Sequence, residues 1–459
     1  MRGGGQMEDY TGKKITIMGL GLNGGGMAAA KFFASKGAVV TVTDLRSAQI
    51  LKPSMDMLAG LDIRYVLEKH DIADFENADI VIKNPAVPLS SPYLAKAKRI
   101  ETDLSVFLSE FKGDVIAVTG SKGKSTTVSA IYHGMKKLKD DTFLGGNITI
   151  SPLTFLEQLT EKSLVILELS SWQLADLRGK GLLKPVVSVI TNIMHEHQNR
   201  YSSVQEYADD KKVIYQSQTP AQYTLCNFDD EYGKQFFAET PAHPIWFSGS
   251  DTGKDEQIWL DGKKGYIKLN GKKAQILPEN LLIPGAHNRK NMLIAAATMY
   301  LYGFKGPEIM DALADFKGIP HRLEFVRELN RRKFYNDTTA TIPQACLAAV
   351  KSFDEPVVLI AGGTDKNLLF DLLPEIAKAA KSIYLLKGSA TDKMIAELDA
   401  HKCRYNGPYS TLEEAVDAAY NGSEPGDVVL FSPGATSFEL FKNEFDRGNS
   451  FRELVLGKK

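Results

Sequence analysis

The chain has 459 residues, of which 43% are hydrophobic and 24% charged, and its formal net charge at pH 7 is −1. The length and globular composition predict about three domains, each able to bury its own core. A net charge so close to zero argues against nucleic acid or an anionic membrane as the main partner.

The cysteines and the N-terminal residues bear on the compartment. Cys226, Cys346 and Cys403 lie far apart and form no C-x-x-C pair, which argues against a disulfide framework or a zinc site. Residues 1–10 contain glycines and acids where a signal peptide has its apolar core, and no apolar run approaches the length of a membrane span. We therefore expect a cytoplasmic protein in a reducing compartment, without membrane insertion.

The first predicted strand, residues 15–18, leads into Gly19-Leu20-Gly21-Leu22-Asn23-Gly24 and a helix over residues 27–35. A second strand, residues 39–43, ends at Asp44. A G-x-G-x-x-G turn with an acid about 20 residues on is typical of dinucleotide sites, where a pyrophosphate lies at the helix N-terminus. Any nucleotide diphosphate fits this pattern, so a nicotinamide dehydrogenase and a sugar-nucleotide enzyme are both open, as is a βα turn without a ligand.

A further strand, residues 79–82, is followed by a loop over residues 83–88 that two prolines make rigid. Between residues 100 and 112 the chain passes to a new strand, residues 115–118. We place the first domain boundary here, between residues 106 and 107.

The loop after this new strand predicts a phosphate cradle. Glycines stand at 120 and 123, and Lys124, Ser125 and Thr126 open a helical segment, so backbone N–H groups surround one anion. The lysine suits the outer phosphates and the Ser125 hydroxyl suits magnesium. The strict pattern G-x-x-x-x-G-K-[ST] is not met, because residue 118 is valine and the loop is two residues shorter. The structural alternative is a lysine-rich turn without a ligand.

Polar residues then follow two more predicted strands. Glu168 lies inside the strand of residues 164–169, where a charge is costly unless it is paired with a lysine or binds a cation, so it is a second magnesium candidate. After the strand of residues 186–190 come His195 and His197, for which a magnesium or phosphate contact is favoured over zinc because no third ligand is near. Lys211 lies on the next helix, where a solvent-exposed lysine is the default interpretation of this residue taken alone.

Residues 224–285 contain short strand-like pieces between turns and predict an edge β ribbon. His287 and Asn288 precede a helix over residues 292–302, where they could contact a nucleotide or cap the helix. From residue 318 the chain again alternates strands and helices, with polar residues at the carboxyl ends of strands. The sequence therefore predicts three consecutive α/β domains, over residues 1–106, 107–317 and 318–459.

Together these stretches closely resemble the Mur ligase family over nearly the whole chain. The order and spacing of the motifs carry the resemblance: GLGLNG with Asp44, TGSKGKST, GGNI, ELSSWQL, NIMHEHQNRY with Lys211, GAHN, PHRLE, NDTTAT, GGTDK and SPGATSFELFKNEFDRGN.

The resemblance implies an N-terminal Rossmann-like domain for a UDP-sugar, a central P-loop ATPase-like domain for ATP and magnesium, and a C-terminal Rossmann-like domain for the incoming amino acid. It implies an ATP-dependent acid–amino-acid ligase that adds D-glutamate to UDP-N-acetylmuramoyl-L-alanine through an acyl phosphate. This step belongs to cytoplasmic peptidoglycan precursor synthesis, which serves cell wall biogenesis, cell shape and cell division, and we expect a monomer.

By the same resemblance, the catalytic residues are Lys124, Glu168, His197 and Lys211, and Ser125 joins the last three in holding magnesium at two sites. ATP would contact Gly120, Ser121, Lys122, Gly123, Lys124, Ser125, Thr126, Asn288, Arg322 and Asp337. The substrates would contact Leu22, Asn23, Asp44, Arg46, Asn147, Thr341, Lys366 and Ser437.

In this family the lysine matched by Lys211 is carbamylated by CO₂, which turns a cation into an oxygen ligand for magnesium. A free lysine has a pKa near 10.4, so at pH about 7.4 only about one in a thousand is the reactive neutral amine. We expect Lys212 and nearby magnesium to lower the pKa of Lys211.

Three positions depart from the family pattern: Thr339 stands where many relatives have lysine, Asn199 where an aspartate is expected, and Glu444 near an aromatic contact. They leave open a Mur-type ligase for another amino acid, such as L-glutamate. Folylpolyglutamate synthetase shares the phosphate loop but is not expected to carry the unit from Gly19 to Asp44. An NAD-dependent dehydrogenase would leave the Lys124 loop idle, and a non-catalytic regulatory protein would not need Lys124, Glu168, His197 and Lys211 together.

Overall fold

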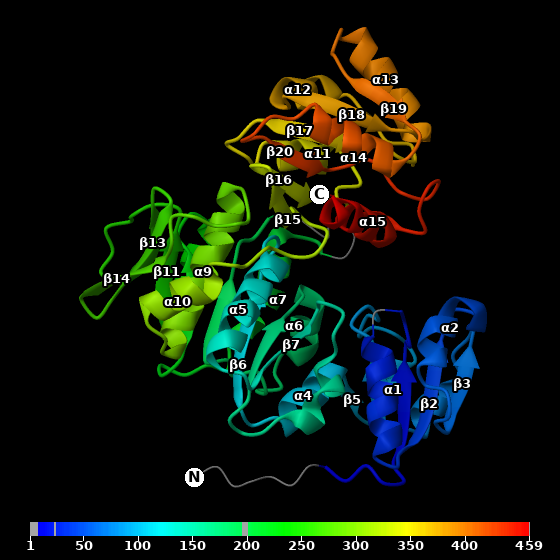
Figure 1. The fold of residues 1–459 in the computed structure, drawn as a ribbon. Coiled ribbons are helices and arrows are strands. Elements are labelled where there is room, and N and C mark those ends of the chain that lie inside the picture. Colours follow the sequence, from blue (N-terminus) through cyan, green and yellow to red (C-terminus); the bar gives the residue numbers. More distant parts are fainter. Residues whose placement is uncertain (1–7, 23, 195–200, 459) are drawn as a thin grey trace. The chain divides into compact units, whose positions relative to one another are not determined.

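The computed structural model describes residues 8–22, 24–194 and 201–458. The strands of these residues form three sheets, each with its own helices (Figure 1). By compactness the chain divides into two units, one made of Met1–Leu277 with Asn291–Leu313 and the other of Pro278–Lys290 with Ala314–Lys459. The first unit contains the first two sheets and the second unit contains the third.

The first sheet has the strand order β3-β2-β1-β4-β5, and all of its neighbouring strands are parallel. The order reverses between β1 and β4, and open parallel sheets bind ligands at the carboxyl ends of strands at such a point. Its elements are β1 (Lys14–Met18), α1 (Gly25–Ser35), β2 (Val39–Asp44), α2 (Ala48–Asp56), β3 (Ile63–Leu67), α3 (Ile72–Glu76), β4 (Ile80–Lys83) and β5 (Ile100–Glu101).

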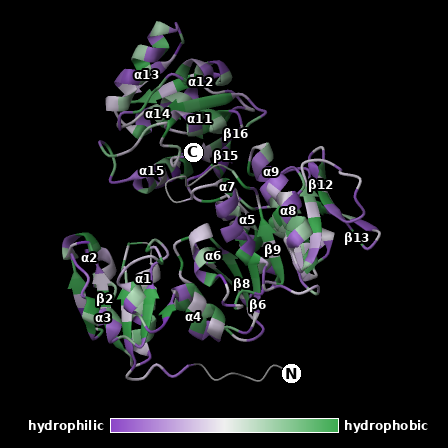
Figure 2. Ribbon diagram, turned by 180° about the vertical axis from the view of Figure 1, so that it is seen from behind, coloured by the Kyte–Doolittle hydropathy of each residue, from purple (hydrophilic) through white to green (hydrophobic). Residues whose placement is uncertain are grey.

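The second sheet has the order β14-β13-β12-β11-β10-β9-β6-β8-β7. The strands from β7 to β12 are parallel, and Figure 2 colours β6, β8 and β9 as hydrophobic, as expected for strands covered on both faces. The elements up to α7 are α4 (Asp103–Glu110), β6 (Asp114–Thr119), α5 (Lys124–Leu138), β7 (Thr142–Gly146), β8 (Leu164–Glu168), α6 (Ser171–Leu177), β9 (Val187–Ile190) and α7 (Val204–Lys211).

The remaining part of this sheet corrects the predicted edge ribbon. Strands β12 to β14 do form an antiparallel ribbon, but β10 and β11 are parallel strands joined by α8. The helix forms because Asp230 caps its N-terminus and Phe236 is buried on its inner face. The elements are β10 (Tyr223–Asn227), α8 (Glu231–Glu239), β11 (His243–Ser248), β12 (Gln257–Asp261), β13 (Lys264–Leu269), β14 (Lys272–Leu277), α9 (Ala286–Tyr302) and α10 (Gly306–Leu313).

The third sheet has the order β15-β16-β20-β17-β18-β19, in which β15 is antiparallel to β16 and the other neighbours are parallel. Strands β17 and β20 are fully buried. The elements are β15 (Glu324–Leu329), β16 (Arg332–Asn336), α11 (Pro343–Val350), β17 (Val357–Ala361), α12 (Leu373–Ala379), β18 (Ser382–Leu386), α13 (Ser389–Ala400), β19 (Asn406–Tyr409), α14 (Leu412–Asn421), β20 (Val428–Phe431) and α15 (Glu444–Gly457).

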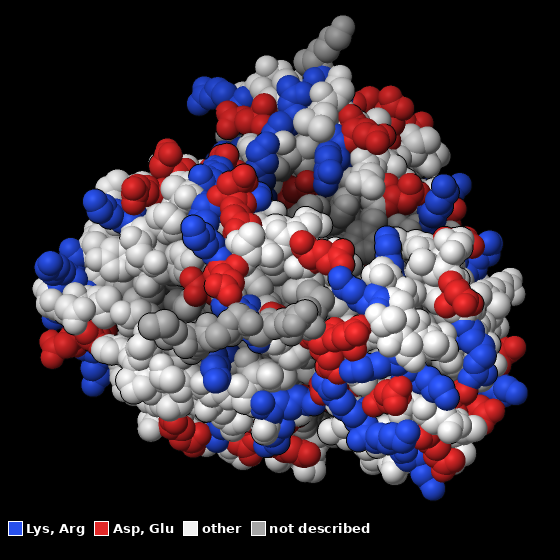
Figure 3. All heavy atoms as spheres, turned by 90° about the horizontal axis from the view of Figure 1, so that it is seen from below, with Lys and Arg blue, Asp and Glu red and all other residues white. Residues whose placement is uncertain are grey.

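Charged side chains are mixed on the surface. On the face drawn in Figure 3, basic and acidic side chains are interspersed, in keeping with the formal net charge of −1. Of the helices described, none combines the length and the apolar character needed to cross a membrane.

Candidate active site

The loop between β6 and α5 is held by the segment that follows β9. Thr191 Oγ1 donates a hydrogen bond to the carbonyl of Lys122 over 2.6 Å, and the N–H of Lys122 donates to Asn192 Oδ1 over 3.0 Å. Gly123 caps α5 at φ +85°, and a Cβ there would clash with Asn291. The backbone at this position therefore requires glycine, and the two hydrogen bonds join the loop to the segment after β9.

Lys124 is the first residue of α5, and its Nζ donates to the carbonyls of Gly120 over 3.0 Å and Ser121 over 2.8 Å. Ser125 and Thr126 follow in the same helical turn, half-buried and buried. Since the N–H groups of a first helical turn point outward at its N-terminus, this arrangement suits an anion. The structure thus brings together the residues that were predicted to hold phosphates.

Lys211 is the last residue of α7 and is only 1% exposed. Its Nζ donates to the carbonyl of Gly120 over 2.9 Å and to Thr119 Oγ1 over 3.3 Å, and lies 4.5 Å from the ring centre of Tyr207. The alternative of an exposed helix lysine is therefore wrong. His195, His197 and Asn199 lie outside the described residues.

Glu168 is the last residue of β8 and is 2% exposed. Its Oε1 accepts a hydrogen bond from Asn147 Nδ2 over 2.9 Å, whereas its Oε2 is buried and has no hydrogen-bond partner among the residues described. A buried carboxylate oxygen without a partner is costly, and a cation would satisfy it. Among the residues described, no lysine pairs with its carboxylate, so the cation interpretation of Glu168 is favoured over the ion-pair alternative.

The predicted magnesium site depends on ligands of different types, a hydroxyl and a carboxylate. Within the described ranges, which omit residues 195–200, no group of three His, Cys, Asp or Glu side chains is arranged to hold a metal ion. The free carboxylate oxygen of Glu168 and the Ser125 hydroxyl are nevertheless the oxygen ligands that magnesium prefers, so these residues fit that ion.

The glycine turn after β1 is organised by Asp44 at the end of β2. Asp44 Oδ2 accepts from the N–H of Gly21 over 3.2 Å, and Oδ1 accepts from the N–H of Arg46 over 3.0 Å. Leu22 is 51% exposed, Arg46 is also exposed, and Asn23 lies outside the described residues. Asp44 thus shapes the turn through both of its carboxylate oxygens.

One pocket of about 330 Å³ connects the glycine turn with the phosphate loop. Gly19, Gly25 and Gly26 line it from the first α/β domain, and Lys124 and Lys211 line it from the second. Asn147, Asn84, Trp172 and Tyr207 are also among its lining residues, whereas Leu22, Asp44 and Arg46 are not. Both predicted anion sites therefore open into the same space within the first compact unit.

In the second compact unit, Asp337 follows β16 and is 5% exposed. Its Oδ1 accepts from the N–H of Leu323 over 3.1 Å and its Oδ2 from Ser432 Oγ over 2.7 Å. Burial raises the pKa of Asp337 to about 7, although both hydrogen bonds oppose the rise. Arg322 is exposed, and Asn288 is buried with its Nδ2 donating to the carbonyl of Pro284 over 2.8 Å.

The predicted amino-acid contacts lie in loops after strands of the third sheet. Ser437 is 2% exposed, and within the part of the chain that the structure describes its Oγ has no hydrogen-bond partner. Lys366 is exposed, with its Nζ 4.3 Å from the ring centre of Phe438, and Thr341 is half-buried. A buried hydroxyl without a partner is available to a ligand.

Arg447 in α15 had no role assigned from the sequence beyond its place in the last motif. It is fully buried and donates to Thr338 Oγ1 over 2.9 Å and to the carbonyls of Ala435 over 3.1 Å and Thr436 over 2.9 Å. Burial lowers its pKa to about 10. Arg447 therefore ties the loop after β16 to the loop that presents Ser437.

Family models match three consecutive parts of the chain. The model "Mur ligase MurD-like, N-terminal domain" matches residues 13–105, "Mur ligase middle domain" residues 118–299, and "Mur ligase, glutamate ligase domain" residues 321–434. The parts coincide with the three sheets, and the predicted fold class of three α/β domains is confirmed.

Individual proteins match over nearly the full length. The UDP-N-acetylmuramoylalanine–D-glutamate ligase of Borreliella afzelii is 43% identical, covering 98% of this chain and 99% of that protein. The ligase of the same name from Treponema pallidum is 38% identical over 97% of each. Among solved structures, UDP-N-acetylmuramate-alanine ligase from Thermotoga maritima superposes with a TM-score of 0.58 at 18% identity, covering 97% of this chain and all of that one, which shows a shared fold.

Proposed function

This chain belongs to the Mur ligase family, and from that premise we propose that it joins D-glutamate to UDP-N-acetylmuramoyl-L-alanine with cleavage of ATP. It is an ATP-dependent amide ligase of peptidoglycan precursor synthesis. We further propose that it works in the cytoplasm as a monomer, and that its functional domains are residues 1–106, 107–317 and 318–459.

The shared pocket carries the proposal. A ligase of this kind must bring the carboxyl group of a sugar nucleotide to the terminal phosphate of ATP, and a dehydrogenase has no need of the second anion site. Gly19, Gly25 and Gly26 line one side of the pocket, and Lys124 lines the other. A UDP-sugar with its diphosphate at α1 can therefore direct its peptide carboxylate toward the phosphate loop.

In the first step, a carboxylate oxygen of the substrate attacks the γ-phosphorus of ATP, and the bond to the β-phosphate oxygen breaks to give an acyl phosphate and ADP. Lys124 then has to leave the carbonyls of Gly120 and Ser121 and stabilise the transferring phosphoryl group, which is largely an electrostatic task. In the second step the amine of glutamate, having lost a proton, attacks the carbonyl carbon. The tetrahedral intermediate expels inorganic phosphate and leaves the amide.

Magnesium would neutralise phosphate charge during this transfer. Ser125 and Glu168 would hold it at one site, and His197 with Lys211 would serve a second site. The orphaned Oε2 of Glu168 supports the first assignment. For the second we propose that Lys211 is carbamylated by CO₂, since an oxygen ligand at its position suits magnesium whereas an ammonium group does not.

The remaining assignments are also proposals. Asn288, Arg322 and Asp337 would contact ATP. The buried hydroxyl of Ser437, which has no hydrogen-bond partner in the described chain, supports a glutamate contact there, together with Thr341 and Lys366. Thr339, one of the departures from the family pattern, donates its Oγ1 hydrogen to the carbonyl of His321 over 2.9 Å and so serves its own loop.

Phosphate release from ATP tests the function directly. The assay supplies UDP-N-acetylmuramoyl-L-alanine and compares D-glutamate with L-glutamate, D-aspartate and lysine. We expect release to depend on both the sugar nucleotide and D-glutamate. Equal or greater phosphate release with another amino acid would support the ligase activity but change the assigned amino-acid substrate. Hydride transfer to NAD without phosphate release would overturn the proposal.

A further inference from the structure

Lys83, at the carboxyl end of β4, lines the shared pocket although no motif drew attention to it. Its side chain is 1% exposed. Strand β4 pairs with β1 where the order of the first sheet reverses, which is the place where open parallel sheets bind ligands. Lys83 is therefore a third lysine of this pocket, beside Lys124 and Lys211 and on the side of the glycine turn.

The ammonium group of Lys83 is paired with Asp176 of α6. Lys83 Nζ donates to Asp176 Oδ2 over 2.5 Å, and the carboxylate side chain is 3% exposed. The pair joins the first α/β domain to the second. Because removing two charges from water offsets most of their attraction, a buried ion pair contributes little net stability. A role in the site explains its burial better than stability does.

A second buried acid faces the same lysine. Asp103, the first residue of α4, also lines the pocket; its Oδ2 accepts from Ser151 Oγ over 2.6 Å and its Oδ1 from the N–H of Leu104 over 2.9 Å. Burial raises the pKa of Asp103, while its hydrogen bonds and the charge of Lys83 act in the opposite direction. A Cβ on Gly25 would lie 3.5 Å from Asp103 Oδ2, so this carboxyl group stands beside the first turn of α1.

Without Lys83, Asp103 would stand in the wall where the proposed substrate places its diphosphate, and the buried carboxylate of Asp176 would lose its partner beside that wall. Like charges in a poorly solvated site repel strongly, so an anionic ligand would bind weakly there. We propose that Lys83 is a positioning residue for the UDP-sugar: it neutralises this acidic wall and anchors the adjoining loop, Asn84 to Ala86, to α6. The inference rests on the proposed function and adds a residue to it.

Substitution of Lys83 by methionine keeps most of the length of the unbranched side chain and removes its charge. For Lys83→Met we expect KM for UDP-N-acetylmuramoyl-L-alanine to rise about tenfold or more, because the acidic charge near the diphosphate is no longer neutralised, with KM for ATP and D-glutamate within about twofold of wild type. The double variant Lys83→Met with Asp176→Asn removes both charges, and we expect its KM to lie between those of wild type and Lys83→Met. The double variant also tests the proposal if Lys83→Met does not fold.

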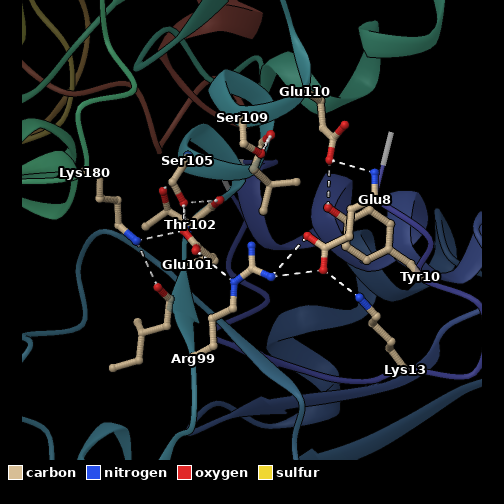
Figure 4. Close-up of polar contacts among 12 residues, drawn as sticks. Glu8, Tyr10, Lys13, Arg99, Glu101, Thr102, Ser105, Ser109, Glu110 and Lys180 are labelled. Atoms are coloured by element: carbon tan, nitrogen blue, oxygen red, sulfur yellow. Dashed lines mark hydrogen bonds and ion pairs between the residues drawn. The ribbon is translucent and has the colours of Figure 1, made fainter. Parts of the chain in front are cut away.

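Lys180 offers a matched control, because it joins the same two domains away from the pocket. Its Nζ donates to Glu101 Oε2 over 2.8 Å and to the carbonyl of Ile100 over 3.2 Å (Figure 4). Neither Lys180 nor Glu101 is among the lining residues. We expect Lys180→Met to leave KM for the UDP-sugar within about twofold of wild type. If KM for the UDP-sugar rose equally in Lys180→Met and Lys83→Met, Lys83 would have only a general role in joining the two domains. That result would overturn the proposal.

Binding of the UDP-sugar alone, measured by calorimetry on each variant, separates this inference from the proposed function. If wild type binds the UDP-sugar tightly and Lys83→Met binds it equally well, the positioning role is refuted although the ligase stands. If wild type neither binds it nor releases phosphate, the proposed function itself has failed. Thermal unfolding of each variant confirms that the compared proteins are folded.

Discussion

Lys124 and Lys211 donate hydrogen bonds to the same acceptor, the carbonyl oxygen of Gly120, over 3.0 Å and 2.9 Å. Two ammonium groups therefore converge on one backbone oxygen of the phosphate loop. Such an arrangement suits a region of concentrated negative charge, because phosphate oxygens can replace the carbonyl as acceptors. Under the proposed function, a carbamate on Lys211 would act on a metal ion bound to those phosphates.

We expect Lys211→Ala to lose about a hundredfold or more in kcat, because a group that acts on transferring charge is removed. If the lysine acts as a carbamate, formate or acetate added at high concentration supplies the missing carboxylate oxygens and restores part of the rate. The rate of phosphate release, measured at increasing concentrations of formate or acetate, quantifies the rescue. Unimpaired turnover in Lys211→Ala would remove the carbamate role.

Lys212 was expected to lower the pKa of Lys211, but two acids pair with its charge, and it therefore serves as the matched control for Lys211. It forms ion pairs with Asp209 over 3.0 Å and with Glu239 over 2.8 Å, away from the loop. Burial alone would lower the pKa of Lys212, but these acids raise it, so it stays charged. We expect Lys212→Ala to keep its kcat within about threefold of wild type, since half-exposed ion pairs contribute little.

Glu168→Gln keeps the hydrogen bond from Asn147, because the amide oxygen can take the place of Oε1. It turns the unpartnered Oε2 into an amide nitrogen that cannot bind a cation. We expect the magnesium concentration for half-maximal phosphate release to rise about tenfold or more. A magnesium titration of the variant checks this. An unchanged midpoint would show that Glu168 is not a ligand.

Ser437→Ala tests the amino-acid site without disturbing the fold. No described hydrogen bond is lost, so the free energy of unfolding should change by less than about 1 kcal/mol. KM for D-glutamate should rise about tenfold, the worth of one hydrogen bond to a charged group. Ser432→Ala is the contrasting variant, because its Oγ donates to Asp337 over 2.7 Å and its loss should destabilise by about 1.5–3 kcal/mol.

The raised pKa of Asp337 makes the stability of the protein depend on pH. This carboxyl group has a pKa of about 7 in the fold and an ordinary value of 3.8, so between these values the folded state holds a proton that the unfolded state lacks. Its contribution is fully present below pH 3.8 and is lost as the pH rises through 7, by about 1.4 kcal/mol per unit of pKa difference.

Denaturant unfolding of wild type and Asp337→Asn between pH 5 and pH 8 measures this dependence. We expect the free energy of unfolding of wild type to fall with rising pH relative to that of the variant, because asparagine does not titrate. A constant difference between the two proteins across this range would show that Asp337 has an ordinary pKa in the fold.

Local patterns located the two glycine-containing turns after β1 and β6 because each turn depends on neighbouring residues only. Apolar strands followed by glycines predicted the turns after β1 and β6, and both turns line the pocket. The start of α5 at Lys124 agrees with the sequence analysis, but the start of α1 was predicted too late. Helix α1 begins at Gly25 because its first turn contains glycines that show no apolar periodicity.

Contacts between distant residues could not be predicted in this way. Lys83 and Asp176 are 93 positions apart, and their pairing depends on how two α/β domains pack. A lysine at the end of the apolar stretch Ile80 to Ile82 does signal a buried charge in need of a partner, but it does not say which acid supplies it. Arg447 presents the same difficulty, since its acceptors are backbone carbonyls that every residue carries.

The division of the chain into compact units limits how the protein can be dissected. The boundaries fall after residues 277, 290 and 313, so neither unit is one uninterrupted length of polypeptide. A stop codon after residue 277 removes residues 291–313 from the first unit, and one after residue 313 leaves residues 278–290 of the second unit attached to a complete first unit. The second unit cannot be obtained whole by a single truncation, so its isolated study requires residues 278–290 to be joined to residues 314–459 with a linker.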